Sequence, residues 1–149
     1  MTAQSSEASS ISLAERAHNI RHHALRMGQV QGQGYVGQAL GAADLLAVSY
    51  FHALNYRPEE PEWEARDRFY LSIGHYAIAL YAALIEAQII PADELETYGS
   101  DDSRLPMSCM SAYTPGMEIT GGSLGQCLFF FFKQKTAYEI DSTLSDSRQ

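Results

Sequence analysis

The sequence has few cysteines, few basic side chains and no long apolar run. Its two cysteines, Cys109 and Cys127, stand at no spacing typical of metal or redox sites, so we interpret them as reduced thiols. The 10 Lys and Arg residues are outnumbered by 18 Asp and Glu, which gives a net charge of −8 and a field that repels phosphate backbones. No basic cluster with interleaved aromatic residues offsets this charge. The composition therefore argues against nucleic-acid binding.

The sequence also lacks signals for export or membrane insertion. Its first ten residues are small and polar, with neither a basic n-region nor an apolar h-region, and its longest apolar runs fall well short of a membrane span. We therefore expect a cytoplasmic protein with no membrane partner. The same polar composition predicts a disordered arm over residues 1–11. A hydrophobic content of 46% in 149 residues is ample for the core of one domain.

The stretch from Asp67 to Ile85 contains two hydrophobic periodicities. Phe69 to Ile73 is a short apolar run between charged residues and a glycine, which predicts a strand buried on both faces. From His75 onward, apolar residues recur every three or four positions, which predicts a largely buried helix. The chain therefore turns at Gly74. Such a turn leaves the first backbone N–H groups of the helix without partners, so an anionic ligand can sit at its entrance.

The histidines allow more than one interpretation. His75 stands at the predicted helix entrance, where an imidazole can donate to a phosphate or transfer a proton. A histidine at a helix start is more often a solvated polar residue, so both interpretations stay open on chemistry alone. His18 and His22, four positions apart, have the spacing of a chelating pair. Because no third ligand follows at a matching spacing, a solvated helix face is favoured over a zinc site, and we predict no metal ligands.

Two further helices are predicted ahead of this stretch. Ser12 to Glu15 is a capping box, which starts a helix that we expect to run to about Met27. The apolar stripe expected on this helix is Leu13, Ala17, Ile20, Ala24 and Met27. A second helix is expected from about Ala39 to Leu54, since its apolar residues fall on one stripe. A short helix with proline in its first turn is expected at Ile90 to Leu95. The sequence thus predicts a mainly helical chain with one strand.

Two segments are rich in glycine. The first, Gly28 to Gly41, has five glycines and is interpreted either as a flexible connector or as a ligand loop, with Gly28 to Gly37 as loop. It is not a Walker loop, because no Lys-Ser/Thr pair follows it. The second segment, Thr114 to Gln126, follows a polar, irregular loop and holds a single carboxylate.

Five short motifs occur in a fixed order: Gly34-Tyr35-Val36-Gly37, Ala43-Asp44-Leu45, Asp67-Arg68-Phe69-Tyr70-Leu71-Ser72-Ile73-Gly74-His75, Tyr98-Gly99-Ser100, and Thr114-Pro115-Gly116-Met117-Glu118 with Gly122-Ser123-Leu124-Gly125-Gln126. This series resembles the N-terminal, thiamine-diphosphate-binding region of transketolase. The resemblance covers Leu13 to Gln126, and residues 12–126 are interpreted as the N-terminal part of that domain. It is strongest to bacterial split transketolases, in which this region is a separate subunit.

The resemblance implies an α/β fold. This is an incomplete thiamine-diphosphate-binding fold, with a parallel sheet and flanking helices, of which this chain holds a mostly helical part with one or few short strands. The implied activity is transfer of a two-carbon ketol unit between sugar phosphates. In the intact parent, the implied cofactors are thiamine diphosphate and Mg²⁺. The implied partner is a C-terminal transketolase subunit or domain, in a homo- or hetero-oligomer, which supplies the glutamate that activates the cofactor.

The resemblance also implies site residues. His75 matches the family histidine that lies over the cofactor and assists substrate proton transfers. The cofactor-binding residues implied are Gly74, His75, Gly122, Ser123, Leu124 and Gly125, the last four matching a Gly-Pro-Leu-Gly loop that touches the aminopyrimidine. Two departures stand out: Tyr35 and Val36 replace a His-Pro pair, and Ser108 stands where many members have a histidine. A second cofactor-side histidine is therefore missing, and the resemblance does not define the sugar substrate.

Beyond Gln126 the resemblance stops. The family continues with a Gly-Asp-Gly motif whose ligands hold magnesium, and this sequence has no such motif. Cys127 to Gln149 begins instead with a phenylalanine run that fits neither helix nor amphipathic strand periodicity. This segment resembles a translated thymine run joined to a sequencing adapter, so we interpret residues 127–149 as a non-native tail that arose as an assembly artefact. The alternative function is therefore a non-catalytic fragment that at most docks on a partner, with weak or absent cofactor binding by this chain alone.

Overall fold

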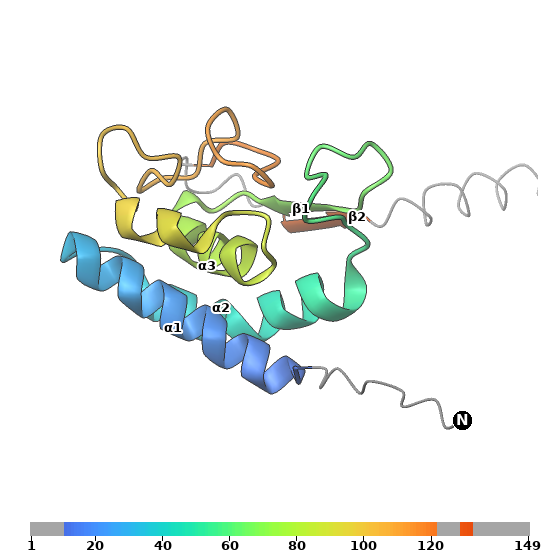
Figure 1. Ribbon diagram of the computed structural model, residues 1–149, viewed down its shortest axis with the longest axis horizontal. Helices are drawn as coiled ribbons and strands as arrows, with labels where there is room; N and C mark the ends of the chain where they lie inside the picture. The colour runs from blue at the N-terminus through green and yellow to red at the C-terminus, as the bar shows by residue number, and fades with distance from the viewer. Residues whose placement is uncertain (1–10, 122–128, 133–149) are drawn as a thin grey trace, which may run out of the picture.

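The computed structural model describes residues 11–121 and 129–132. Its elements are, in order, α1 (Leu13–Gln31), α2 (Val36–Val48), the π-helical turn η1 (Ser49–Ala53), β1 (Arg68–Leu71), the 3₁₀ turn η2 (Gly74–Tyr76), α3 (Ala77–Glu86), the 3₁₀ segment η3 (Ala92–Thr97) and β2 (Phe129–Phe132). Figure 1 shows α1 and α2 on one side of α3, with β1 and the loops of residues 98–121 on the other. The predicted mostly helical α/β class with few short strands is confirmed.

α1 starts as predicted and ends later than predicted. The Ser12 hydroxyl accepts from the Glu15 N–H at 3.2 Å, and the Glu15 carboxylate accepts from the Ser12 N–H at 2.9 Å, so the capping box is confirmed. The helix continues to Gln31, so the prediction that all of residues 28–37 form a loop is wrong. Gly28 has a packing role instead, because a Cβ there would lie 2.5 Å from Val36 Cγ2 of α2. The helix ends at Gly32 in the left-handed conformation, at φ 66°.

α2 and α3 form the core with α1. α2 begins at Val36 rather than Ala39, and continues into η1 with a hydrogen bond from the Ser49 hydroxyl to the Leu45 carbonyl at 2.9 Å. Every residue of α3 from Ala77 to Ile85 is buried, which confirms the predicted buried helix. Its alanines let α1 and α2 pack closely on it. No helix in the described part of the chain is both long and apolar enough to cross a membrane.

β1 confirms the predicted strand with a shift of one to two residues. Phe69 and Leu71 are buried while Arg68 and Tyr70 are partly exposed, so the predicted burial on both faces is wrong. β1 pairs with β2 in antiparallel register, with Phe69 opposite Phe131. The parallel strand pairs that the resemblance implies are therefore not represented among the described strands.

The β2 pairing corrects one more expectation. The phenylalanine run fits no helix or amphipathic strand periodicity, yet residues 129–132 form a strand that pairs with β1. Backbone pairing does not require side-chain alternation, and phenylalanine has a high strand propensity. A strand edge accepts any β-prone segment within reach, so the pairing does not test the origin of residues 127–149, and the tail interpretation stays a prediction.

Candidate functional site

The turn between β1 and α3 carries His75, which is half-buried. The Tyr76 N–H donates to the Ile73 carbonyl at 3.0 Å, and the Ala77 N–H donates to the Gly74 carbonyl. The prediction that the first N–H groups at this entrance lack partners is therefore wrong for Tyr76 and Ala77, because a 3₁₀ turn uses them. At this helix entrance, fewer free backbone N–H groups can bind an anion than the sequence predicts.

The N-terminal ends of α2 and α3 meet at this turn. The ring of Tyr35, directly ahead of α2, lies 4.7 Å from the ring of His75, centroid to centroid, at an interplanar angle of 83°. Tyr35 is the residue that the resemblance puts in the place of a family histidine. The structure thus brings the first glycine-rich segment beside the predicted catalytic histidine.

The second glycine-rich segment reaches the same turn at Gly121. A Cβ on Gly121 would lie 2.9 Å from the Gly74 nitrogen and 2.6 Å from Cys109 Sγ, so only glycine fits this approach. The Gly121 N–H donates to the Cys109 carbonyl at 3.1 Å, and its distance to Cys109 Sγ is also 3.1 Å. Burial raises the pKa of the Cys109 thiol, which is free, as predicted.

The remaining predicted cofactor residues are not among the described ones. The structure does not describe Gly122, Ser123, Leu124 and Gly125. Cys127 and residues 1–10, which are all but the last residue of the predicted arm, also lie outside the described residues. Gly74, which precedes His75 in the chain, lies against Gly121, the last described residue before this loop. Their roles in cofactor binding stay predictions.

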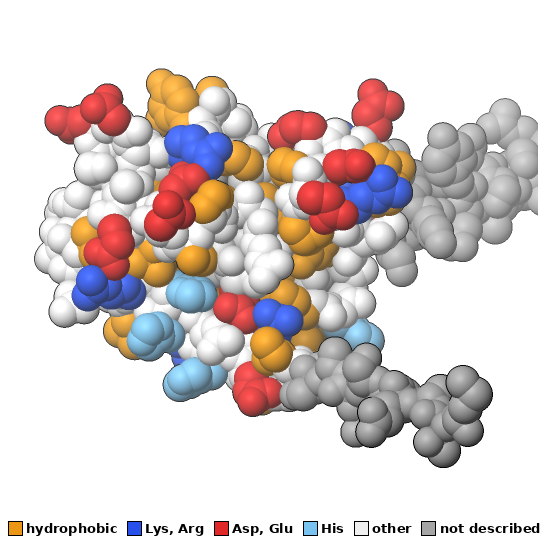
Figure 2. All heavy atoms as spheres, viewed as in Figure 1, with side chains coloured by type: hydrophobic (Ala, Val, Ile, Leu, Met, Phe, Trp, Pro, Cys, Tyr) orange, Lys and Arg blue, Asp and Glu red, His pale blue; other side chains and the backbone are white. Residues whose placement is uncertain are grey.

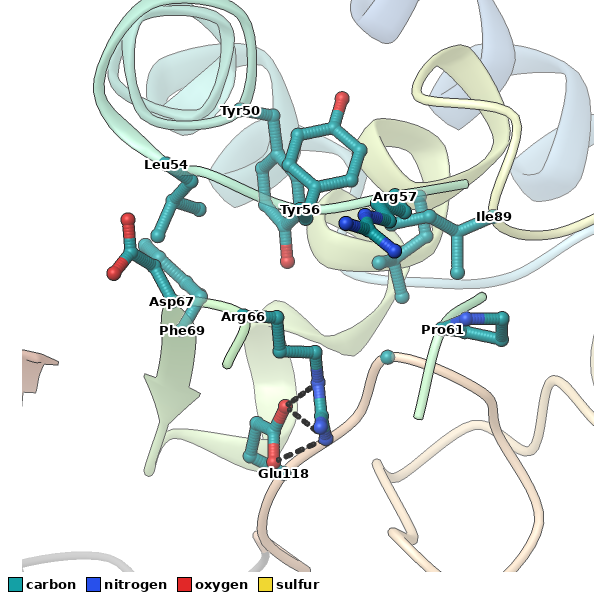
Figure 3. Close-up of a pocket in the computed structure, with 12 residues that line it drawn as sticks. Tyr50, Leu54, Tyr56, Arg57, Pro61, Arg66, Asp67, Phe69, Ile89 and Glu118 are labelled. Carbon is teal, nitrogen blue, oxygen red and sulfur yellow. Dashed lines mark hydrogen bonds and ion pairs between the residues drawn. The ribbon is translucent and has the colours of Figure 1, made fainter. Parts of the chain in front are cut away.

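A buried ion cluster anchors the second segment to β1. The Arg66 guanidinium donates to the Glu118 carboxylate at 2.9 and 3.2 Å, and Arg68 donates to the same carboxylate at 2.9 Å. The Arg66 and Glu118 side chains are 8% and 9% exposed. Figure 3 shows the Arg66 side chain, from the segment ahead of β1, pointing at Glu118 on the loop. The cavity beside them is about 20 Å³, which is room for a water-sized group and not for a cofactor.

No local sequence pattern indicates this ion cluster. Its only signal was the single carboxylate of the second glycine-rich segment, together with two arginines just ahead of a strand. Burial and the negative charge of Glu118 raise the pKa of Tyr50, whose side chain lines the same cavity. The cluster fixes the path of residues 114–121 and with it the approach of Gly121 to the turn.

The arginines of the described residues are all engaged with carboxylates. Arg16 contacts Glu86, Arg21 contacts Asp44, Arg26 contacts Glu96, Arg57 contacts Glu60, Arg66 and Arg68 contact Glu118, and Arg104 contacts Glu94. Figure 2 shows blue side chains lying beside red ones on one face of the molecule. His18 and His22 are exposed on α1, and within residues 11–121 and 129–132 no three His, Cys, Asp or Glu side chains group as metal ligands.

Comparison with known proteins gives consistent matches. The family model described as "Transketolase, thiamine diphosphate binding domain" matches residues 13–136, beyond the Gln126 limit of the resemblance noted above. The chain is 80% identical over 118 residues to "Putative uncharacterized transketolase family protein y4mO" of Sinorhizobium fredii, covering 79% of this chain and 42% of that protein. It is 39% identical over 116 residues to "6-deoxy-6-sulfo-D-fructose transketolase subunit SqwG" of Clostridium sp., covering 78% and 42%.

Solved structures agree with these relatives. Transketolase from Leishmania mexicana superposes with a TM-score of 0.72 at 34% identity, covering 78% of this chain and 18% of that one. Transketolase from Campylobacter jejuni gives a TM-score of 0.68 at 33% identity, covering 76% and 18%. Together, the fold and the family match define part of a thiamine diphosphate-binding α/β domain. The chain belongs to the transketolase family and spans less than half the length of the curated relatives that it matches.

Proposed function

We propose that this chain provides the N-terminal, cofactor-binding part of a transketolase-type transferase, which moves a two-carbon ketol unit between sugar phosphates. The observation that carries the proposal is the position of His75 on the turn between β1 and α3, with the Tyr35 ring on one side and the Gly74–Gly121 contact close by. The glycines beside the His75 imidazole have no side chain, so a flat, heteroaromatic cofactor can approach the backbone there.

In this proposal the residues of the turn face thiamine diphosphate in the intact parent. When bound, the cofactor supplies the electron sink that allows a carbon–carbon bond beside a ketose carbonyl to break. In this proposal His75 accepts and returns a proton of a substrate hydroxyl, and the backbone of residues 122–125 contacts the aminopyrimidine. Mg²⁺ would need oxygen ligands, and no group of three His, Cys, Asp or Glu side chains that could hold a metal ion occurs among the described residues, so this proposal assigns its ligands to the rest of the parent domain.

Recognition of the substrate phosphate belongs to a partner in this proposal. Every arginine of the described residues already contacts a carboxylate, and the two lysines of the chain fall outside those residues. A C-terminal transketolase subunit or domain supplies these cations and the glutamate that activates the cofactor. The name of the Clostridium relative describes a subunit, which supports such an assembly. The assembly is proposed to act in the cytoplasm.

The test is a transfer assay on a parent protein that carries residues 13–121 unchanged, continues through the rest of the family domain and is combined with its C-terminal partner. A positioned proton-transfer group contributes about 10²–10⁴-fold, so His75→Ala is expected to lower kcat by that factor while circular dichroism stays unchanged. His18→Ala, at an exposed position of α1, is the matched control. A wild-type rate in His75→Ala would contradict the catalytic role.

A second candidate function is a non-catalytic module that docks on a partner. An apolar cavity of about 380 Å³ lies between α2, β1 and α3, with Leu45 on its rim, and Leu45 and Val48 of α2 are exposed. Calorimetric titration of the 149-residue chain with thiamine diphosphate and Mg²⁺ separates the candidates for this chain. A helix terminus contributes about 0.3–2 kcal/mol to an anion whereas micromolar binding needs about 8, so weak or no binding is expected. A saturable, Mg²⁺-dependent micromolar signal would contradict the docking-only function.

A further inference from the structure

The contact between Tyr35 and His75 has a geometry that can orient an imidazole. The two ring centroids lie 4.7 Å apart with the planes at 83°, which is the edge-to-face arrangement that aromatic pairs prefer. Tyr35 is 44% exposed while His75 is half-buried, so the ring pair lies near the surface of the described part of the chain.

The backbone holds Tyr35 in this place from both sides. Gly34 has φ of 138°, a conformation that other residues rarely adopt, and a Cβ there would lie 3.2 Å from Ile78 Cδ1 of α3. The turn therefore lies directly against α3. On the other side, the Tyr35 carbonyl accepts from the Ala39 N–H at 3.3 Å, which starts α2. The backbone contacts on both sides of Tyr35 therefore hold its ring beside His75.

No polar partner among the described residues orients the His75 side chain. Within residues 11–121, neither a hydrogen bond nor an ion pair joins its imidazole to another side chain or to backbone, and its aromatic neighbour is the Tyr35 ring. Many histidines that act on protons are held by a carboxylate or carbonyl, which uses one ring nitrogen. A ring contact restrains the plane of the imidazole without a hydrogen bond from either ring nitrogen to the described residues.

We propose that Tyr35 is a positioning residue, whose aromatic ring fixes the plane of the His75 imidazole so that its nitrogens can reach a substrate hydroxyl. This inference rests on the proposed role of His75 in proton transfer. The ring carries the effect, and the phenol hydroxyl is not required for it. Phenylalanine therefore replaces tyrosine without loss of orientation, whereas leucine removes the edge-to-face contact.

The first test observes the contact itself in the 149-residue chain. The ring-proton resonances of His75 are assigned by NMR as those lost in His75→Asn, and are compared in Tyr35→Leu and Tyr35→Phe. Because an adjacent aromatic ring shifts nearby protons, Tyr35→Leu is expected to move the His75 resonances and leave those of His18 and His22 in place. Tyr113→Leu, at another exposed tyrosine, is the matched control and should leave His75 unchanged.

The second test measures transfer kinetics in the parent assembly that carries residues 13–121. Misplacing a reacting group by about 1 Å can cost about 10²-fold, so Tyr35→Leu is expected to lower kcat by about 10- to 100-fold with little change in KM. Tyr35→Phe is expected to rescue the rate relative to Tyr35→Leu. A fall in kcat that coincides with the His75 shift supports the positioning role.

Three results would overturn the inference. Unmoved His75 resonances in Tyr35→Leu would show that the ring does not orient the imidazole. Equal losses in Tyr35→Phe and Tyr35→Leu would assign the effect to the hydroxyl, and a change in KM alone would assign it to substrate binding. Failure of the proposed function is a separate result, because His75→Asn would then keep the wild-type rate whatever Tyr35 does.

Discussion

The two sides of α3 are held by different kinds of contact. On the side of α1 and α2, apolar residues such as Ile20, Met27 and Ala43 are fully buried and share the packing among many neighbours. On the side of β1 and residues 98–121, buried apolar residues such as Leu105 and Cys109 pack as well. Polar contacts between distant segments are added there, such as the Arg66–Glu118 pair and the hydrogen bond from the Tyr81 hydroxyl to the Pro106 carbonyl at 3.0 Å. Loss of one buried charge partner on the loop side should therefore cost at least as much as loss of one buried aliphatic side chain on the helical side.

Glu118 is the position where this difference should be largest. Removing one partner of a buried ion pair leaves the other charge buried, which costs about 3–5 kcal/mol, so Glu118→Ala should lower the free energy of unfolding by that amount. Urea titration followed by circular dichroism measures it. The control is Glu60→Ala, because the exposed Arg57–Glu60 pair should contribute about 1 kcal/mol or less. Equal losses in the two variants would show that Glu118 does not anchor the loop.

The helical side was largely predictable because its information is local. Ala17, Ile20, Ala24 and Met27 recur at helical spacing, and all four are buried on α1 as predicted. Leu13 belongs to the same predicted stripe but is exposed, since a periodic pattern does not tell how far the neighbouring helix extends.

The loop side was not predictable in the same way. Glu118 and Arg66 are 52 positions apart, and no local period connects them. The candidate site shows the same division: the turn at Gly74 and His75 was found from a change of period, whereas the contacts of His75 with Tyr35 and of Gly74 with Gly121 depend on how distant segments pack. Sequence motifs named these residues without showing which of them touch.

Two substitutions in α1 test how much the buried side chains of the helical side stabilise the fold. Ile20 is 0% exposed and Leu25 is 51% exposed, and both lie on α1. Truncating a buried large aliphatic side chain costs about 2–5 kcal/mol, so Ile20→Ala should destabilise by that amount in urea titration. Leu25→Ala should change stability by about 0.5 kcal/mol or less, because surface substitutions usually do. A large loss in Leu25→Ala would mean that this face of α1 is covered in solution.

Substitution of alanine for two glycines should change the free energy of unfolding in opposite directions. Gly116, on the loop side, has φ of 78°, and a Cβ there would lie 2.7 Å from Leu84 Cδ2, so Gly116→Ala should destabilise by about 1–3 kcal/mol. Gly41 lies inside α2, where an added Cβ would meet nothing within 4 Å, so Gly41→Ala should stabilise by about 0.4–1 kcal/mol. Thermal unfolding of both variants measures the signs. Destabilisation by Gly41→Ala would show that a partner approaches α2 there.

A smaller effect than at Glu118 is expected at a polar cluster on the helical side. The Glu86 carboxylate, at the end of α3, accepts from Arg16 at 2.8 Å and from Asn19 at 3.1 Å, and lies 3.2 Å from the His23 ring nitrogen. Burial alone would raise the pKa of Glu86, but the hydrogen bonds from Asn19, Arg16 and His23 lower it overall. Arg16 and His23 are 25% and 23% exposed whereas Arg66 is 8% exposed, so the groups left behind stay partly in water and loss of Glu86 should disturb the fold less than loss of Glu118.

The lowered pKa of Glu86 sets the sign of a pH dependence. A carboxyl whose pKa is lowered by folding stabilises the folded state above its unfolded pKa, about 4.3, and this stabilisation is lost as pH falls through the folded value. Glu86→Gln should therefore be less stable than the wild type at neutral pH, with a difference that shrinks on acidification. Asn19→Ala, which removes one donor, should weaken the same pH dependence. Urea titrations from neutral to acidic pH measure it, and stability curves that stay parallel for the wild type and Glu86→Gln would show that these hydrogen bonds do not favour the ionised carboxylate.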